Sequence, residues 1–139
     1  MIGPKLDKTV PVEFTGPRKK ALTVRAKGVC EGCGKPLRTE LHHRLYRGRG
    51  GRGDVVNGLS LCGFGNHASE GCHGIAHTGE GQALGWSVRS GYDPAEVPAL
   101  VFVDGRQQWV RFLPDGHHVP VHEADAIEYL QLIHARKEA

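Results

Sequence analysis

The chain has 139 residues, which suits one domain with a small appendage; glycine occurs 20 times, about twice the usual share, and only 6% of residues are aromatic. Residues 1–57 carry 13 Lys/Arg against 5 Asp/Glu, whereas the remaining residues carry 5 against 10, so we expect a polyanionic partner on one face. The start has no apolar core of signal-peptide length and the longest apolar run covers residues 99–103, which disfavours secretion or a membrane span and favours a cytoplasmic location.

The N-terminal half predicts short elements separated by glycine and proline. Residues 1–17 contain three prolines and scattered charge, and are interpreted as a flexible arm. Residues 18–27, RKKALTVRAK, predict a short basic helix, and residues 37–45 a strand or hairpin. Residues 46–57 are rich in glycine and predict a loop, after which residues 59–61 resume an apolar turn.

The C-terminal half predicts short strands followed by a helix. A helical stretch after Cys72 should stop at Thr78-Gly79. Strands with Asp-Gly turns between them are predicted at GWSVRS, ALVFVD, QQWVRFL and HVPVH. The tail EADAIEYLQLIHARKEA has apolar residues near helical spacing and predicts a closing amphipathic helix. The chain therefore divides into an arm (1–17), a core (18–83) and an extension of strands and a helix (84–139).

The four cysteines predict a structural zinc site. Cys30 and Cys33 form a C-x2-C knuckle, and Cys62 and Cys72 follow after 28 intervening residues. Four thiolates complete a tetrahedral Zn²⁺ site, which can supply about 10–16 kcal/mol of binding energy that is also folding energy. A redox C-x-x-C or unrelated buried thiols are the alternatives. His67, within the nine residues between the second pair, could replace one thiol.

Four histidines predict a second metal site. His42 and His43 are neighbours, so they can serve one site only where a strand ends and its pleating relaxes. His73 and His77 stand at i and i+4, on one face of a helix. Cys72 projects about 100° away from His73 around that helix, so one helix could offer a thiolate to zinc and two imidazoles to a second ion. We interpret the other histidines of the C-terminal half as ordinary surface or core residues: His117, His118, His122 and His134.

The order of these motifs resembles that of the HNH endonucleases, whose catalytic unit is a ββα-metal fold. The residues that carry the resemblance are Cys30-x2-Cys33, Leu41-His42-His43-Arg44, Gly50-Gly51, Asn57-Gly58-Leu59, Leu61-Cys62 and Cys72-His73. The sequence of residues 30–77 looks especially like that of the small HNH proteins of bacteriophages, and the resemblance is looser downstream. The separation of the second cysteine pair is longer than in the compact family knuckle. The implied fold is an α+β, zinc-stapled ββα-metal core with extra short strands and a C-terminal helix.

The resemblance implies a role for each motif residue. His43 would be the general base that takes a proton from the attacking water. His42 would ligate the catalytic metal together with His73 and His77, and Asn57 would brace the loop by hydrogen bonds to backbone. Many family members have aspartate where His42 stands, so Mg²⁺, Mn²⁺ and Zn²⁺ all remain candidate catalytic ions.

Four arginines follow the histidine pair: Arg44, Arg47, Arg49 and Arg52. The planar guanidinium grips phosphate, and glycines between the arginines let the backbone follow a groove. We therefore expect these arginines to contact the DNA backbone; a flexible solvated loop is the alternative.

These features predict a metal-dependent HNH endonuclease that hydrolyses DNA phosphodiester bonds. The phage resemblance would place it in the host cytoplasm, in DNA processing or packaging, with terminase as a partner. A zinc-containing nucleic-acid-binding module without catalysis is the main alternative, and it needs no His43. A redox C-x-x-C protein would need neither His73 nor His77.

Overall fold

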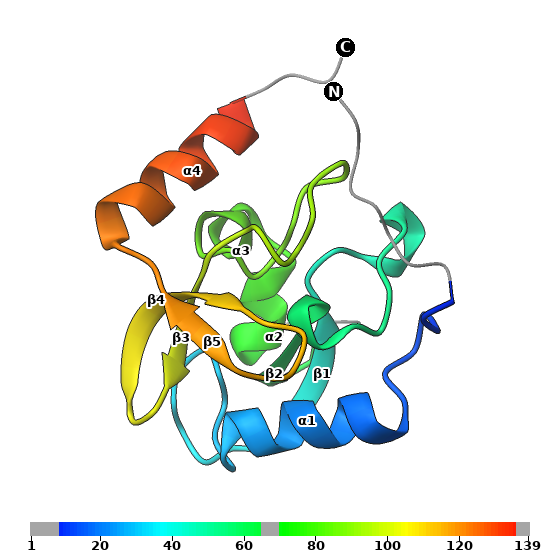
Figure 1. Cartoon of the computed structure of the whole chain (residues 1–139). Helices are drawn as coiled ribbons and strands as arrows, with labels where there is room; N and C mark the ends of the chain where they lie inside the picture. Colours follow the sequence, from blue (N-terminus) through cyan, green and yellow to red (C-terminus); the bar gives the residue numbers. More distant parts are fainter. Residues whose placement is uncertain (1–8, 65–69, 136–139) are drawn as a thin grey trace.

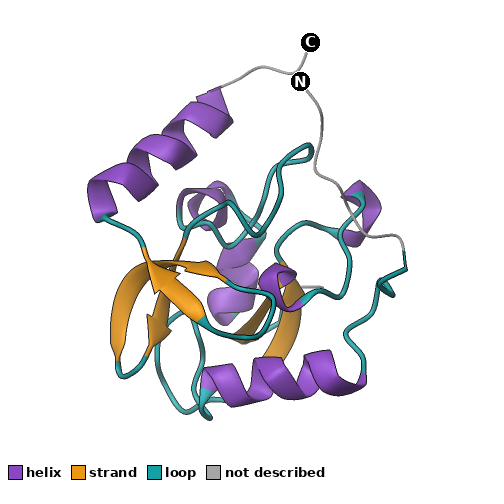
Figure 2. Ribbon diagram, in the orientation of Figure 1, coloured by secondary structure: helices purple, strands orange, loops and turns teal. Residues whose placement is uncertain are grey.

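The structure is a computed structural model that describes residues 9–64 and 70–135, with four α-helices and two small antiparallel sheets (Figure 1). The helices and strands are, in chain order, α1 (Gly16–Ala26), β1 (Thr39–His43), β2 (Gly58–Cys62), α2 (Gly71–Ala76), α3 (Gly79–Ala83), β3 (Ala99–Val103), β4 (Arg106–Phe112), β5 (His118–Pro120) and α4 (Glu123–Ala135). Two 3₁₀ turns, Arg47–Arg49 and Val55–Asn57, interrupt the connection between β1 and β2. Figure 2 shows the short α2 beside the β1–β2 sheet. The fold is therefore mixed α and β.

The basic helix predicted for residues 18–27 is confirmed as α1. Pro17 stands at the start of the helix, where its missing N–H costs nothing. The helix ends at Lys27 and Gly28, whose φ angles of 53° and 78° are left-handed and suit a helix terminus. The helix buries Leu22, Arg25 and Ala26 and contacts β2.

The apolar turn predicted at residues 59–61 is wrong, because these residues form the strand β2. It pairs antiparallel with β1, so that His43 lies opposite Gly58 and Thr39 opposite Cys62. All five residues of β2 are buried, and the strand contacts both α1 and α2. The alternation Leu59–Ser60–Leu61 is too short to distinguish a strand from a turn, and the burial of both faces cannot be read from the sequence.

Downstream of α3, a helix that was not predicted, the C-terminal half follows the prediction except at one segment. The strands β3, β4 and β5 and the helix α4 are confirmed, and Asp104 and Gly105 form the turn between β3 and β4 with φ angles of 51° and 80°. The segment GWSVRS is not a strand. Trp86 and Val88 are buried, but their N–H groups donate to the carbonyls of Gly81 and Arg44, so the segment crosses the core as a loop.

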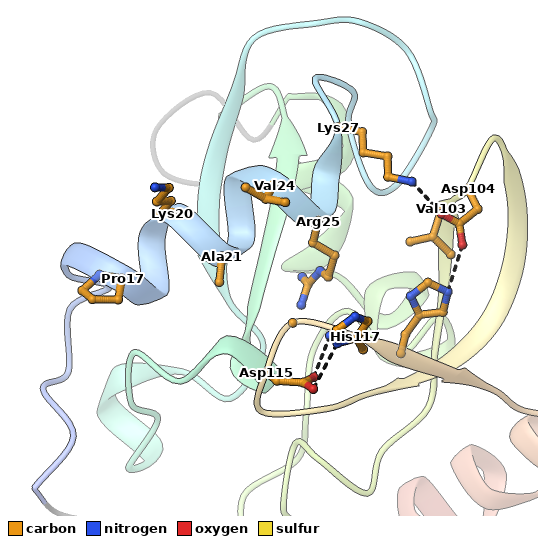
Figure 3. Close-up of a pocket in the computed structure, with 12 residues that line it drawn as sticks. Pro17, Lys20, Ala21, Val24, Arg25, Lys27, Val103, Asp104, Asp115 and His117 are labelled. Atoms are coloured by element: carbon orange, nitrogen blue, oxygen red, sulfur yellow. Dashed lines mark hydrogen bonds and ion pairs between the residues drawn. The ribbon is translucent and has the colours of Figure 1, made fainter.

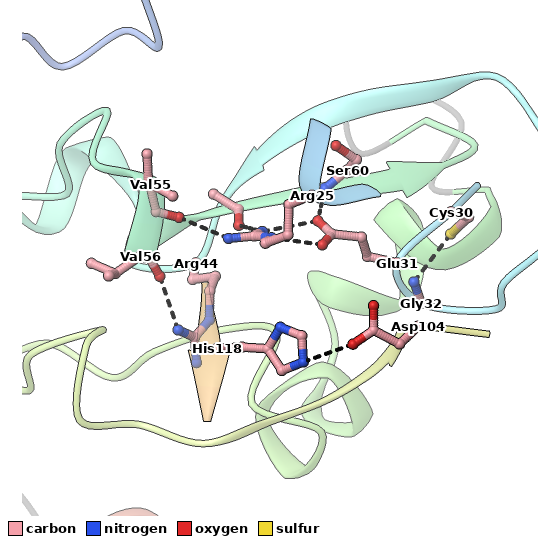
Figure 4. A network of polar contacts seen from close by, with 11 residues as sticks. Arg25, Cys30, Glu31, Gly32, Arg44, Val55, Val56, Ser60, Asp104 and His118 are labelled. Carbon is pink, nitrogen blue, oxygen red and sulfur yellow. Dashed lines mark hydrogen bonds and ion pairs between the residues drawn. The ribbon is translucent and has the colours of Figure 1, made fainter. Parts of the chain in front are cut away.

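A buried ion pair joins α1 to β2 and to the first cysteine pair (Figure 4). Arg25 donates from Nε and Nη2 to the two carboxylate oxygens of Glu31, at 2.8 and 2.9 Å. Arg25 also donates to the carbonyls of Val55 and Gly58, and Glu31 accepts from the Ser60 N–H. Neither side chain is more than 3% exposed. A buried pair in which both partners are also hydrogen-bonded to backbone offsets much of its desolvation cost.

The substitution Arg25→Met should lower the free energy of unfolding by about 3–5 kcal/mol, because it leaves the Glu31 carboxylate buried without its partner. Lys27→Met is the matched control, since the Lys27–Asp104 ion pair at the same end of α1 is exposed and its loss should be barely measurable. Denaturant unfolding in saturating zinc measures both variants. Equal effects of the two substitutions would contradict a structural role for the buried pair.

Candidate functional site

The four cysteines lie together where the loop after α1 meets β2 and α2. Their sulfur atoms are all within 4.8 Å of one another, and those of Cys33 and Cys62 are 3.8 Å apart. Zn–S bonds of about 2.3 Å place the sulfurs of a tetrahedral site about 3.8 Å apart. The cluster of Cys30, Cys33, Cys62 and Cys72 therefore could hold zinc, in agreement with the sequence-based prediction.

Cys30 is the sulfur that ionises most readily in this cluster. The Cys72 thiol donates to it, and the N–H groups of Gly32 and Cys62 each donate to it at 3.3 Å. These hydrogen bonds, that of Cys72 above all, lower the pKa of Cys30 to about 4 even though burial raises it. The same sharing raises the pKa of Cys72, and burial raises that of Cys62. At neutral pH the metal-free cluster thus carries a thiolate, the form that binds a metal ion.

Close packing explains the glycine inside the knuckle. A Cβ at Gly32 would lie 2.8 Å from the Cys72 sulfur and 2.9 Å from the Trp86 ring, so any side chain there would push the cluster apart. The alternative ligand His67 lies outside the described residues. The four sulfurs come together without it.

Three histidines form a second candidate metal cluster, as predicted. Each of His42, His73 and His77 offers a nitrogen within 4.8 Å of the others, and their ring centroids are 5.0–5.3 Å apart. His42 comes from β1, His73 from α2, and His77 from the residue that caps α2. His42 is 2% exposed, whereas His77 is open to solvent, so the cluster forms the wall of a surface cavity.

Hydrogen bonds hold two of these rings so that one nitrogen of each remains available. His42 donates from Nε2 to the Trp86 carbonyl at 2.7 Å, which leaves the lone pair on Nδ1. His73 bonds through Nδ1 to a carboxylate oxygen of Glu40, also at 2.7 Å, which leaves Nε2. Burial lowers the pKa of His42 to about 3. Partial desolvation of the His77 ring, together with the nearby His73, lowers the pKa of His77, so both rings are neutral at pH 7. Such partners of the distal nitrogen are typical of histidines that bind metals.

Tyr46 closes one side of the histidine cluster. Its ring stacks on His77 with centroids 5.3 Å apart and meets His42 edge-on at 6.1 Å. Its hydroxyl donates to the Ala76 carbonyl at 3.3 Å, near the end of α2. Tyr46 therefore restrains the exposed His77 ring.

His43 shares a cavity with the three clustered histidines. The cavity has a volume of about 260 Å³ and is lined by Glu40, Leu41, His42, His43, Tyr46, Arg47, His73 and His77. The Nε2 of His43 donates to the Val12 carbonyl at 2.7 Å, and the Phe14 ring lies against it with centroids 4.3 Å apart. Burial lowers the pKa of His43. The ring is thus held with Nδ1 as its free acceptor.

The segment that holds His43 belongs to the predicted flexible arm, residues 1–17. Its first eight residues lie outside the described part, but residues 9–15 pack on the core. Val10 is buried, and the Pro11 carbonyl accepts from the Gly53 N–H at 2.8 Å. A Cβ at Gly53 would lie 2.3 Å from the Glu13 carbonyl oxygen, so glycine is needed for this approach. The described part of the arm is therefore docked.

Asn57 makes the backbone contacts that a bracing role requires. Its Oδ1 accepts from the Leu45 N–H at 2.6 Å, and its Nδ2 donates to the carbonyls of Leu45 and Arg52 at 3.1 and 2.9 Å. The side chain is 1% exposed. These bonds close the loop between β1 and β2 at both ends.

The prediction that Arg44 contacts DNA is wrong, because its side chain is fully buried. Its guanidinium donates to four carbonyls, of Val56, Gly85, Pro94 and Val97, at 2.7–3.0 Å. Burial lowers its pKa to about 9, so the group remains charged at pH 7. Arg44 therefore connects loops inside the protein.

The other three arginines reach the surface to different degrees. Arg47 is exposed and forms an ion pair with Glu13. Arg49 is exposed, and its guanidinium carbon lies 5.0 Å from the centre of the Tyr46 ring. Arg52 is half-buried, and its Nε has no hydrogen-bond partner within the described ranges. Arg47 and Arg49 are thus the accessible cations of this loop.

Several contacts at the site were not predicted from the sequence. Glu40 had a readable signal, since it stands two residues before His42 and alternate residues of a strand share a face. Tyr46 and Phe14 had none, because their contacts depend on how the loop and the arm fold back. The Trp86 and Val12 carbonyls could not be predicted as partners, because every residue has a backbone carbonyl.

A larger cavity, of about 570 Å³, lies away from the histidine cluster, between α1 and the turn after β4 (Figure 3). Its walls include Val24, Val103 and the exposed Asp115–His117 pair. None of the clustered cysteines or histidines lines it. We therefore place the candidate site at the smaller, polar cavity.

Comparison of the chain with protein-family models, curated proteins and solved structures gives no match. Within residues 9–64 and 70–135, no helix has the length and apolar character needed to cross a bilayer.

The substitution Cys33→Ser should remove the tightly bound metal and lower the melting temperature sharply, because a four-thiolate site contributes about 10–16 kcal/mol of apparent binding energy. His73→Ala should leave that metal and the melting temperature nearly unchanged while abolishing a second, weaker site. Metal analysis after dialysis and thermal unfolding with added Zn²⁺ measure both effects. Full zinc retention by Cys33→Ser would rule out the cysteine site.

Proposed function

We propose that the chain is a metal-dependent HNH endonuclease that hydrolyses DNA phosphodiester bonds. The observation that supports this proposal best is the single cavity lined by His43 together with the clustered histidines His42, His73 and His77. The chain order β1, β2, α2 also agrees with the ββα-metal unit that the sequence resemblance implies. A proton acceptor beside a cation site is the arrangement that metal-assisted hydrolysis requires.

The histidine donors fit an ion that accepts neutral imidazole. Imidazole suits Zn²⁺ and Ni²⁺, whereas Mg²⁺ prefers oxygen ligands. Three protein ligands leave coordination positions for water and substrate. A cation bound there would neutralise charge on the scissile phosphate and stabilise the departing oxygen.

His43 has the environment of a general base. Its Nε2–H donates to the Val12 carbonyl, an acceptor only, so the lone pair lies on Nδ1. Burial keeps the ring neutral at pH 7, and contact with Phe14 restrains the ring. A neutral imidazole in this state can take a proton from water.

DNA is the substrate that the surrounding charge supports. Arg47 lines the same cavity as the histidines, and Arg49 stands on the adjoining turn. Contacts of this kind bind phosphate without reading the base sequence, so we expect weak sequence preference. By the resemblance to phage proteins, we further propose a role in phage DNA processing or packaging, with terminase as partner.

A non-catalytic zinc-containing nucleic-acid-binding module is the second candidate. The cysteine cluster and the exposed arginines would serve it equally well. A binding module would not require an oriented, neutral His43 beside three further imidazoles. The two candidates therefore differ in what the loss of His43 does.

The substitution His43→Ala should reduce plasmid nicking by about 10²–10⁴-fold, the usual contribution of a general base. Zinc content and DNA affinity should stay at wild-type values, since His43 belongs to neither metal cluster. Supercoiled plasmid incubated with Zn²⁺, Ni²⁺, Mn²⁺, Mg²⁺ or EDTA provides the measurement, with Mg²⁺ expected to support less activity than Zn²⁺ or Ni²⁺.

The matched control is His117→Ala, which removes an exposed imidazole at the other cavity and should cleave like wild type. Cleavage by His43→Ala at the wild-type rate would exclude the enzymatic function. DNA binding with no cleavage by any variant would instead favour the binding module.

The substitution Asn57→Ala should lower the cleavage rate while leaving zinc content and DNA binding in place. The loss of three hydrogen bonds would loosen the loop that follows His43. Hydrogen exchange at Leu45, whose N–H is bonded to Asn57, should become faster in the variant. Unchanged exchange and full activity would show that the brace is unimportant.

A further inference from the structure

A polar cavity of about 530 Å³ lies beside the proposed cleavage site. It is lined by Arg49, Gln82, Arg89, Ser90 and His134, which come from the turn after β1, from α3, from the loop after α3 and from α4. All five side chains can donate hydrogen bonds, and none is a carboxylate. Such a lining favours a ligand with several anionic oxygens.

Two of these groups are held in place by the fold. The Nη1 of Arg89 donates to the carbonyls of Ile133 and His134 at 3.0 and 3.3 Å, which fixes the guanidinium against the end of α4. The Nε2 of His134 is buried and has no hydrogen-bond partner among residues 9–64 and 70–135. A buried ring nitrogen without a partner is costly, and rotation of the ring toward the cavity would let this nitrogen donate to a ligand oxygen.

The cavity connects to the histidine cluster through stacked side chains. The Tyr46 ring stacks on His77 at 5.3 Å, and the Arg49 guanidinium lies 5.0 Å from the centre of the Tyr46 ring on the way to the cavity. These contacts place the cavity next to the histidine cluster, on the side of Tyr46 and Arg49.

We propose that this cavity binds a backbone phosphate of the nucleic acid near the scissile bond. The position along the strand rests on the proposed nuclease function, whereas the affinity for phosphate rests on the cavity itself. Arg49 and Arg89 supply the charge, and Gln82, Ser90 and His134 supply neutral donors. The subsite would fix the register of the strand over the metal-binding histidines.

The test uses the full-length, zinc-loaded His43→Ala protein, which should bind DNA without cutting it. Fluorescence anisotropy with a 16-base-pair duplex over a range of salt concentrations gives the number of phosphates engaged. Adding Arg49→Gln should reduce the slope of log K against log salt by about 0.9, which is one phosphate contact. Adding Ser90→Asp places a carboxylate at the exposed rim and should weaken binding at every salt concentration.

Two controls match these substitutions in charge and exposure. Arg106→Gln and Gln107→Glu change exposed residues at the start of β4, away from this cavity, and should leave the salt slope and affinity unchanged. The His134 ring resonances in a ¹H–¹⁵N spectrum should shift when the duplex is added, and should not shift in the Ser90→Asp variant. Equal binding by Arg49→Gln, Ser90→Asp and their controls would overturn the subsite.

Inorganic phosphate distinguishes the two sources of the ligand. If millimolar phosphate shifts the His134 resonances as far as the duplex does, and displaces the duplex, the cavity is a site for free phosphate and the assignment to the DNA backbone is overturned. Weak binding of phosphate together with a DNA-dependent shift supports the assignment. Both results are independent of cleavage, so a failure of the nuclease proposal would be recognised separately in the plasmid assay.

Discussion

The arrangement of both candidate metal clusters depends on the neighbouring residues Cys72 and His73 of α2. Adjacent helical residues project about 100° apart, so Cys72 joins the sulfurs of the loop and β2 while His73 joins His42 on β1. Because β1 and β2 are paired along their whole length, the position of α2 against this sheet brings Cys72 to Cys62 and His73 to His42. Metal bound by the cysteines would therefore also orient the imidazoles. Folding of the zinc site and the geometry of the proposed active site would then be coupled.

Two buried arginines hold together segments that lie outside the sheets. Arg25 links α1 to Glu31, and Arg44 holds four carbonyls from segments that form no sheet. Backbone carbonyls inside a protein need hydrogen-bond donors, and these guanidinium groups supply them. Glycine allows backbone segments to pack closely, since a Cβ at Gly51 would lie 1.7 Å from the Leu45 carbonyl oxygen. The arginine- and glycine-rich stretch is thus partly an interior feature.

The sequence was sufficient where a feature is local. The helices α1 and α4 and the Asp-Gly turn after β3 follow from local patterns, whereas the grouping of His42 with His73 and His77 was expected from the resemblance to the HNH family. It was insufficient where burial decides, because a run of arginines does not show that Arg44 points inward while Arg47 points outward. Backbone partners such as the Val12 carbonyl are invisible for the same reason. The fold was therefore more predictable than the contacts that orient its proposed reactive groups.

The contact between His43 and Val12 makes the orientation of the proposed base depend on the leading segment. The imidazole proposed to activate water is anchored by a peptide group 31 residues earlier, on a segment whose described residues, 9–15, supply none of the metal donors. Anything that lifts this leading segment, such as a binding protein or an appended domain, would release the ring while both clusters of donors stay assembled. Control of turnover would then require no change in metal content, only a change in what holds the beginning of the polypeptide.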